Sequence, residues 1–152
     1  MRSYEIVRLD TADYHKCGNI WDMTKQSALA EQFYDEILAD NRVVYVCVEN
    51  GDFIGEGALV FDNGDPDYTI PERRVYLSRM IVKAERRGVG IGSAILDFLI
   101  DKASELGFEE MTVGVDKSNV VARHLYESNG FDTVIFDGVD EHGEYVKLLK
   151  TL

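Results

Sequence analysis

Glycines and arginines stand close together in the middle of the chain, in a pattern suited to binding phosphate. The segment consists of Arg86, Arg87, Gly88, Val89, Gly90, Ile91, Gly92 and Ser93. The apolar residues that follow recur at helical spacing, and the first-turn N–H groups of a helix point outward without an acceptor. The helix dipole adds positive potential at the same end, and glycine lets an anion approach the backbone closely. Arg86 and Arg87 are expected to add mobile positive charge. The sequence therefore predicts a cradle for a diphosphate.

Three loop types use such a cradle, and the spacing of this segment separates them. A nucleotide triphosphatase loop ends in Gly-Lys-Ser/Thr, whereas here Ser93 follows Gly92 directly. A dinucleotide fingerprint needs a third glycine where this chain has Ser93, and it opens a βαβ unit, whereas this segment lies past the middle of the chain. The pattern Arg-x-x-Gly-x-Gly is met by Arg87, Gly90 and Gly92. The spacing therefore favours this third type, which resembles the loop that binds the diphosphate of coenzyme A in the GNAT superfamily of N-acetyltransferases.

A second group of polar and small residues follows in a segment predicted to be helical. Offsets of three, four and seven residues fall on one face of a helix, so Asn119, Ala122 and Tyr126 share a stripe. An amide can pair with the amides of an extended ligand, a small side chain leaves the ligand room, and a phenol can protonate a leaving thiolate. Gly130 and Phe131 complete the motif as a turn glycine and a core aromatic.

Together the two motifs resemble those of the GNAT superfamily of N-acetyltransferases, in the order and spacing of that family. The resemblance implies that acetyl-CoA is the cosubstrate and that an amine attacks the thioester directly in a ternary complex. It also implies that coenzyme A contacts the strand before the cradle. The residues implied for coenzyme A binding are Met80, Ile81, Val82, Arg86, Arg87, Gly88, Val89, Gly90, Ile91, Gly92, Ser93, Asn119, Ala122, Arg123 and Tyr126.

The resemblance implies catalytic roles for some residues and leaves others open. It makes Tyr126 the general acid and the Val82 amide the donor to the tetrahedral oxyanion. The general base is undecided: Glu56 and Asp116 are candidates, and a chain of water molecules would need neither. The aromatic candidates for the acceptor pocket are Trp21, Tyr34 and Tyr68.

The acceptor that the resemblance implies is a primary amine of a small molecule, a peptide or a protein. The net charge is −12, which argues against nucleic acid as a partner. This charge is first of all favourable for solubility, and its second interpretation is a field that attracts a cationic amine. An alternative function is a regulatory domain that binds acyl-CoA without turnover. A homodimer is compatible with the resemblance, because exposed final strands often pair in that family, and the sequence leaves the oligomeric state open.

Length and composition set the remaining bounds. A chain of 152 residues with 45% hydrophobic residues suits a single domain over residues 1–152 with its own core. No apolar run is long enough for a membrane span, and the first residues lack an apolar signal segment. Cys17 and Cys47 are too few for a disulfide framework, and no metal-ligand spacing occurs. The sequence predicts a cytoplasmic protein without a metal.

The elements that position these residues alternate in type along the chain. The predicted strands cover residues 4–9, 42–49, 52–61, 73–82, 110–116, 131–136 and 144–149. The predicted helices cover 12–24 with an interruption near Gly18, 28–39, the segment from the cradle to Leu106, and a segment from Ser118 or Asn119 to Ser128. Residues 137–143 are expected to form a turn. This order matches the GNAT fold, an α/β fold. It has a mixed, mostly antiparallel sheet of about seven strands flanked by four helices, splayed between the fourth and fifth strands.

Overall fold

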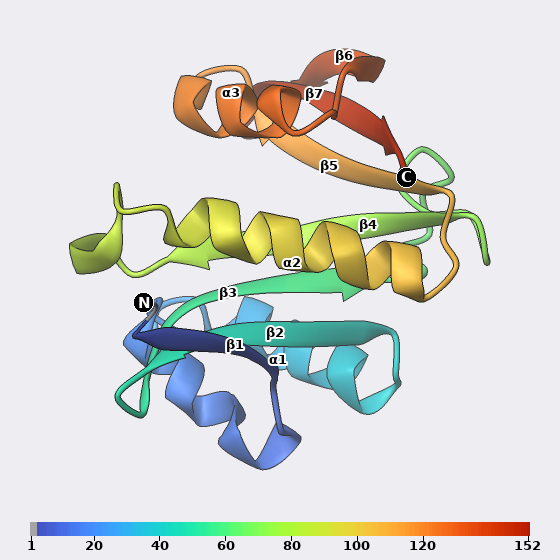
Figure 1. Cartoon of the computed structure of the whole chain (residues 1–152). Helices are drawn as coiled ribbons and strands as arrows, with labels where there is room; N and C mark the ends of the chain where they lie inside the picture. The colour runs from blue at the N-terminus through green and yellow to red at the C-terminus, as the bar shows by residue number, and fades with distance from the viewer. Residues whose placement is uncertain (1–2) are drawn as a thin grey trace. The chain divides into compact units, whose positions relative to one another are not determined.

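The computed structural model describes residues 3–152. Met1 and Arg2, which begin the segment predicted to lack an apolar signal, lie outside the described residues. The strands are β1 (Tyr4–Arg8), β2 (Arg42–Glu49), β3 (Asp52–Val60), β4 (Arg74–Val82), β5 (Glu110–Asp116), β6 (Thr133–Asp140) and β7 (Gly143–Thr151). The 3-10 helices are η1 (Thr11–Asn19) and η2 (Ala84–Arg86), and the α-helices are α1 (Ser27–Leu38), α2 (Ile91–Glu105) and α3 (Val120–Ser128) (Figure 1).

The seven strands form one sheet in the hydrogen-bonded order β1-β2-β3-β4-β5-β7-β6. β1 pairs with β2, β5 with β7 and β6 with β7 in antiparallel fashion, whereas β4 and β5 are parallel. The registered pairing of β4 with β5 covers only Arg74–Tyr76 and Glu110–Thr112, although both strands continue further. This mixed sheet with its splay after the fourth strand confirms the predicted fold class.

The chain forms two compact units, which are interleaved along the sequence because β4 and α2 contribute to both. The first contains Met1–Leu59 and Ser78–Leu99, and the second contains Val60–Leu77 and Ile100–Leu152. The single domain expected from the length therefore stays a prediction, and each unit is described by itself below. Among the described residues, no helix combines the length and the apolar character needed to cross a bilayer.

In the first unit, one face of β3 packs against α2, and the other face contributes to a hydrophobic core that includes residues of η1 and α1. Gly55 and Gly57 lie against α2: an added Cβ would lie 2.9 Å from Ile95 Cδ1 at Gly55 and 2.7 Å from Leu99 Cδ1 at Gly57. Because side chains alternate along a strand, Glu56 between them faces the other side of the sheet. There the buried residues of η1, α1 and the strands gather: Leu9, Cys17, Ile20, Trp21, Ala30, Phe33, Val44, Val46, Phe53 and Ala58.

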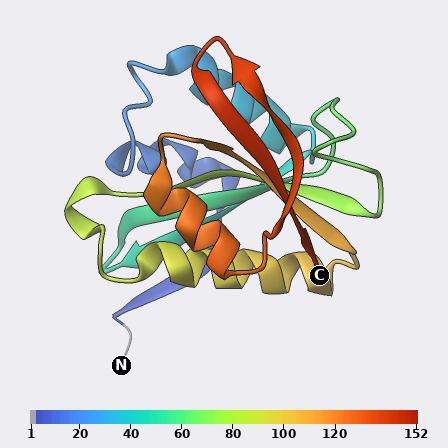
Figure 2. The same cartoon turned by 90° about the horizontal axis from the view of Figure 1, so that it is seen from above.

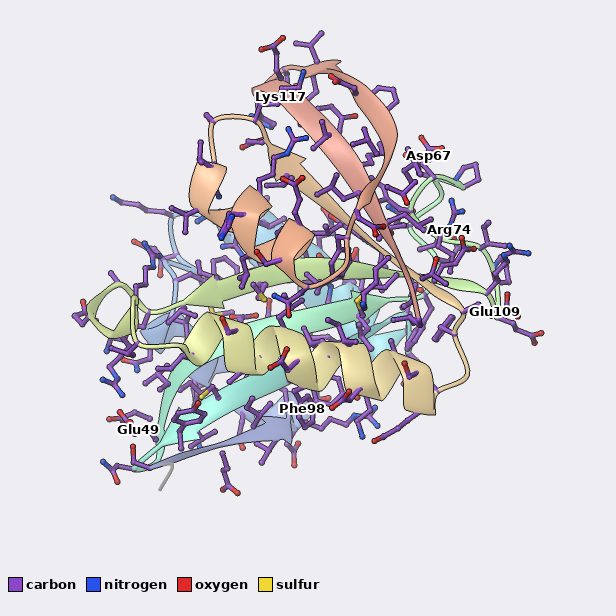
Figure 3. The ribbon with its side chains drawn as sticks, turned by 45° about the horizontal axis from the view of Figure 1, so that its top comes forward. Glu49, Asp67, Arg74, Phe98, Glu109 and Lys117 are labelled. Carbon is purple, nitrogen blue, oxygen red and sulfur yellow. The ribbon has the colours of Figure 1, made fainter. Side chains whose placement is uncertain are left out.

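In the second unit, β5 and β7 form the centre and β6 the outer strand (Figure 2). Val113 pairs with Leu148 and Val115 with Val146, and all four side chains are buried. The loop before β4 is fixed by Arg74, whose Nη1 donates to the backbone oxygen of Asp67 at 3.0 Å; both residues are labelled in Figure 3. The unit thus has its own core and a well-anchored loop.

Two predicted elements need correction. Residues 12–24 were expected to form a helix interrupted near Gly18, whereas η1 is a 3-10 helix that ends at Asn19. The turn expected over residues 137–143 is mostly strand, because Asp137 pairs with Val146 and Asp140 with Gly143. Pairing with β7 therefore overrides the weak strand preference of this aspartate-rich segment.

Candidate functional site

The cradle predicted at residues 86–93 runs from the last residue of η2 through a short loop into the first turn of α2. Gly88 and Gly90 have positive φ angles of 79° and 88°, which side chains rarely adopt, and nothing lies within 4 Å of a Cβ built on either residue. In the described part of the chain, the N–H groups of residues 88–93 donate to no backbone acceptor, and Ala94 is the first to bond within α2, to Gly90. The loop therefore offers a row of free donors beside open space, as a bound diphosphate would need.

The two arginines of the cradle are held in place by the protein. Arg86 Nη2 pairs with Glu49 Oε2 at 2.8 Å, and Glu49, labelled in Figure 3, ends β2. Arg87 Nε donates to the carbonyl oxygen of Val82 at 2.9 Å. The sequence predicted freely mobile charges at both positions. Instead, one guanidinium is partly neutralised by Glu49, and the other braces the turn out of β4.

The end of β4 carries the residues expected along the coenzyme A chain. Met80, Ile81 and Val82 are half-buried, and no registered pairs with β5 extend beyond Tyr76. Lys83 N donates to the Ile54 carbonyl at 2.8 Å, which anchors the strand to β3. A strand edge without registered partners can add an extended ligand by backbone hydrogen bonds.

Glu56, one of the two candidate bases, lies in the buried centre of the first unit. The residue is only 3% exposed, and its Oε1 accepts a hydrogen bond from the indole Nε1 of Trp21 at 2.7 Å. Burial raises the pKa of Glu56 to about 7, although the bond from Trp21 and the nearby charges of Arg79 and Arg42 oppose this rise. A carboxyl with this pKa exchanges its proton near neutral pH, as a general base must.

Arg79 is a residue of this centre that the sequence reasoning passed over. It adopts a positive φ of 58° within β4, and its guanidinium lies 4.4 Å from the centroid of the Trp21 ring. Its Nε is buried without a hydrogen-bond partner among the described residues. Burial lowers the pKa of Arg79, whose guanidinium nevertheless stays charged. The one hint in the sequence was an arginine in the second half of β4, directly before the apolar residues Met80, Ile81 and Val82.

Arg42, in contrast, is fully engaged in the same centre. Its Nε pairs with Glu36 Oε1 at 2.9 Å, its Nη2 donates to Ser78 Oγ at 3.0 Å, and its guanidinium lies 3.8 Å from the Phe33 ring centroid. The residue is therefore a structural cation whose charge is already compensated.

A pocket of about 1030 Å³ opens between η1, the following turn and α1. Two of the predicted acceptor residues, Trp21 and Tyr34, line it. The remaining lining residues are Thr11, Ala12, Tyr14, His15, Gly18, Asn19, Ile20, Asp22, Met23, Thr24, Ala30, Glu31 and Asp35. Trp21 thus lines the pocket while its ring N–H is bonded to Glu56, so the structure links the pocket to this candidate base.

In the second unit, α3 carries the second motif. The Asn119 Oδ1 accepts from Ala122 N at 3.1 Å and caps the helix, which leaves only its amide N–H groups for a ligand. Arg123 Nε pairs with Glu127 at 3.1 Å. Tyr126 is 6% exposed and packs edge-on against Phe131, with ring centroids 5.6 Å apart. Burial raises the pKa of Tyr126 to about 12, so its phenol keeps the proton that a general acid must give.

The last two candidates also lie in the second unit. Asp116 ends β5 with an exposed side chain, and its backbone oxygen accepts from Asn119 N at 2.9 Å. Tyr68 stacks on Tyr76 at 4.4 Å between ring centroids, and its backbone oxygen accepts from Thr112 Oγ1 at 2.7 Å. These contacts give both residues evident structural roles. Among the described residues, no group of three or more metal-binding side chains occurs.

Comparison with known proteins gives consistent matches. The sequence model of the acetyltransferase (GNAT) family matches residues 4–131. The uncharacterized N-acetyltransferase YhfO of Bacillus subtilis (strain 168) is 31% identical over 106 residues, which cover 68% of each chain. An N-acetyltransferase from Staphylococcus aureus Mu50 superposes with a TM-score of 0.76 at 18% identity, covering 99% of both chains.

A further solved structure, yncA from Salmonella typhimurium with its cofactor acetyl-CoA, gives a TM-score of 0.70 at 24% identity. It covers 99% of this chain and 95% of that one. The solved structures share the fold, and the family match extends over most of the sequence, including both motifs. The chain therefore belongs to the GNAT family of acetyltransferases.

Proposed function

We propose that the protein is an N-acetyltransferase that transfers the acetyl group of acetyl-CoA to a primary amine. The observation that carries this proposal is the row of free N–H groups at residues 88–93, beside open space at Gly88 and Gly90. Such donors at a helix N-terminus suit a diphosphate, which coenzyme A contains. The solved relative with acetyl-CoA supports the same cosubstrate.

The cosubstrate supplies an activated acetyl thioester, and the residues of this chain supply the rest. In the proposed reaction the amine nitrogen bonds to the acetyl carbon while the carbon–sulfur bond breaks. The Val82 N–H is the candidate donor to the oxyanion, by the family resemblance. Since Met80, Ile81 and Val82 lie on a strand end without registered β5 partners, the extended arm of the cosubstrate can pair there.

Glu56 is the proposed base, because an attacking amine must first lose the proton of its ammonium form. A pKa of about 7 lets this carboxylate accept that proton near neutral pH, and its link to the pocket through Trp21 supports the role. As Glu56 is nearly inaccessible, we expect the proton to reach it through water rather than by direct contact. Asp116 is the weaker candidate, since its exposed carboxylate is far less shielded from solvent.

Tyr126 is the proposed acid, which protonates the coenzyme A thiolate as it leaves. Its position in the family motif on α3 supports this role, and its raised pKa means that the phenol carries its proton at neutral pH. Asn119 and Arg123 are the proposed cosubstrate contacts of the same helix, with Ala122 as the small residue that admits the chain. Tyr68 stays a candidate for the acceptor entrance on its aromatic character alone.

Coenzyme A binding and thiol release together test the proposal. We expect Gly90→Glu to abolish binding of coenzyme A in isothermal titration calorimetry, since it places bulk and negative charge in the cradle. Gly64→Glu is the matched control, because Gly64 also has a positive φ, of 81°, and open space around it. An unchanged affinity of Gly90→Glu for coenzyme A would contradict the proposal that the cradle binds this cosubstrate. Binding of acetyl-CoA without thiol release on any amine would favour a regulatory domain.

A further inference from the structure

The pocket between η1 and α1 has a one-sided charge. Its lining contains the carboxylates of Asp22, Glu31 and Asp35 and no lysine or arginine, and His15 is the one imidazole. Asp22 Oδ1 is occupied by the N–H groups of Thr24 and Lys25, at 3.1 and 2.9 Å. In the described part of the chain, the two carboxylates of α1, Glu31 and Asp35, accept no such bonds.

Glu31 and Asp35 are one helical turn apart, so their side chains are neighbours on the same face of α1. Within residues 3–152 neither carboxylate has a hydrogen bond or an ion pair to another side chain, whereas the adjacent Glu36 pairs with Arg42. Two like charges at this spacing destabilise a helix slightly. Since both line the pocket, a cation placed there would relieve their repulsion.

Two tyrosine rings also form part of the pocket wall. Tyr14 and Tyr34 stack with ring centroids 5.4 Å apart and an interplanar angle of 29°, and both line the pocket. The Tyr14 hydroxyl donates to the Ala30 carbonyl at 2.8 Å, which holds this ring in place. Flat aromatic faces accept methylene groups by burial and ammonium groups by cation–π attraction. The wall therefore suits an aliphatic chain that carries positive charge.

The pocket lining also includes Trp21, beside which two ionisable groups lie. Trp21 contacts Glu56 through its N–H, and the Arg79 guanidinium covers a face of the same ring. A positive charge nearby disfavours an ammonium group and favours the neutral amine. The Arg79 charge would thus disfavour the ammonium form of an amine beside Trp21, while a second ammonium would be attracted to Glu31 and Asp35.

We propose that the acceptor is a linear aliphatic diamine or polyamine, whose reacting amine lies toward Trp21 and whose distal ammonium is bound between Glu31 and Asp35. This inference rests on the proposed N-acetyltransferase function and adds the substrate class. The two carboxylates act in recognition, so they affect the KM for the acceptor rather than the turnover number.

The test compares 1,5-diaminopentane with n-pentylamine, which has the same length and lacks the second amine. We expect kcat/KM for the diamine to exceed that for the monoamine by about tenfold, the size expected of two exposed ion pairs. In the double variant Glu31→Gln with Asp35→Asn, the ratio of kcat/KM for the diamine to that for the monoamine should fall to about twofold, because the KM for the diamine rises. Adding 0.5 M NaCl to the wild type should have a similar effect. Asp97→Asn combined with Asp101→Asn, a pair with the same spacing on α2 outside the pocket, is the matched control.

Equilibrium binding of both amines, measured by calorimetry without acetyl-CoA, keeps the test independent of turnover. Tighter binding of the diamine that the Glu31 and Asp35 variant loses supports the inference even if no thiol is released, a result that would count only against the proposed enzyme function. Equal kcat/KM and equal binding of the two amines would overturn the inference and leave the acetyltransferase proposal standing. An effect of the same size in the α2 control would overturn it too.

Discussion

The indole N–H of Trp21 donates to the Glu56 carboxyl at 2.7 Å, across a gap of 35 residues in sequence. The same ring carries the guanidinium of Arg79 on its face, 4.4 Å from the ring centroid. The acid and the cation therefore contact the same ring, and no ion pair joins Glu56 to Arg79 among the described residues. A direct pair would hold the pKa of Glu56 low. Without one, burial dominates and the pKa reaches about 7.

The first prediction concerns stability against pH. The pKa of Glu56 is raised from 4.5 to about 7 in the folded protein, so the folded state keeps a proton that the unfolded chain has lost between these values. The contribution of Glu56 to the free energy of unfolding therefore falls as pH rises through this window, by about 3 kcal/mol in total. We expect Glu56→Gln to be more stable than the wild type at pH 8 and similar to it at pH 4. Urea unfolding at several pH values checks this, and a difference that stays constant with pH would contradict it.

The second prediction concerns the catalytic role of the same residue pair. Trp21→Phe removes the N–H that lowers the pKa of Glu56, so this pKa should rise above about 7. The acid limb of the pH profile of kcat/KM should then move to higher pH, while coenzyme A affinity stays unchanged. Glu56→Gln should lower kcat/KM by about a hundredfold or more and abolish this limb, and adding Trp21→Phe should then shift nothing further. An acid limb that survives in Glu56→Gln would point to another base.

The third prediction concerns Tyr126. Tyr126→Phe keeps the ring that packs on Phe131 and removes only the hydroxyl, so folding should be preserved. We expect kcat to fall by about a hundredfold, with little change in the Kd for coenzyme A, because proton transfer to the thiolate is lost. Tyr145→Phe is the control, as this tyrosine stacks on Phe136 of the outer strand. Equal turnover in Tyr126→Phe would mean that another group protonates the thiolate.

The fourth prediction concerns the glycine next to the base. A Cβ at Gly57 would lie 2.7 Å from Leu99 Cδ1 and 3.1 Å from Ile95 Cγ2, so β3 and α2 would have to move apart. We expect Gly57→Ala to lower the free energy of unfolding by about 1–3 kcal/mol, as overpacking of a core does. Gly18→Ala is the control, since its nearest neighbour is Met23 Sδ at 3.8 Å. Chemical denaturation measures both, and an unchanged midpoint in Gly57→Ala would contradict the packing argument.

Local patterns predicted much of the fold. The strands over 42–49 and 110–116 have the predicted bounds, because Val-rich runs are flanked by strong turn residues such as Asn50 and Gly51. Gly107 follows the long helix with a positive φ of 92°, as expected of a residue just past a helix end. Prediction failed at Asp137–Asp140, where the partner strand decides the structure and the residues themselves carry little preference for it.

The candidate site was predictable only where its chemistry is local. The glycine spacing of the cradle is a property of consecutive residues, so the free N–H groups could be expected. The choice between Glu56 and Asp116 depends on burial and on Trp21, which lies far away in sequence. Likewise, only the structure shows that Glu49 engages Arg86, since these residues are 37 positions apart.

Trp21 is also the sole tryptophan of the chain. Its ultraviolet emission therefore arises at one known place, against a carboxyl group on the indole edge and a guanidinium on the indole face. Ionisation of that carboxyl changes the electric field on the excited indole, so the native protein carries a built-in optical reporter. A spectrofluorometer can follow both the proton equilibrium of this centre and the arrival of an acceptor, without any label.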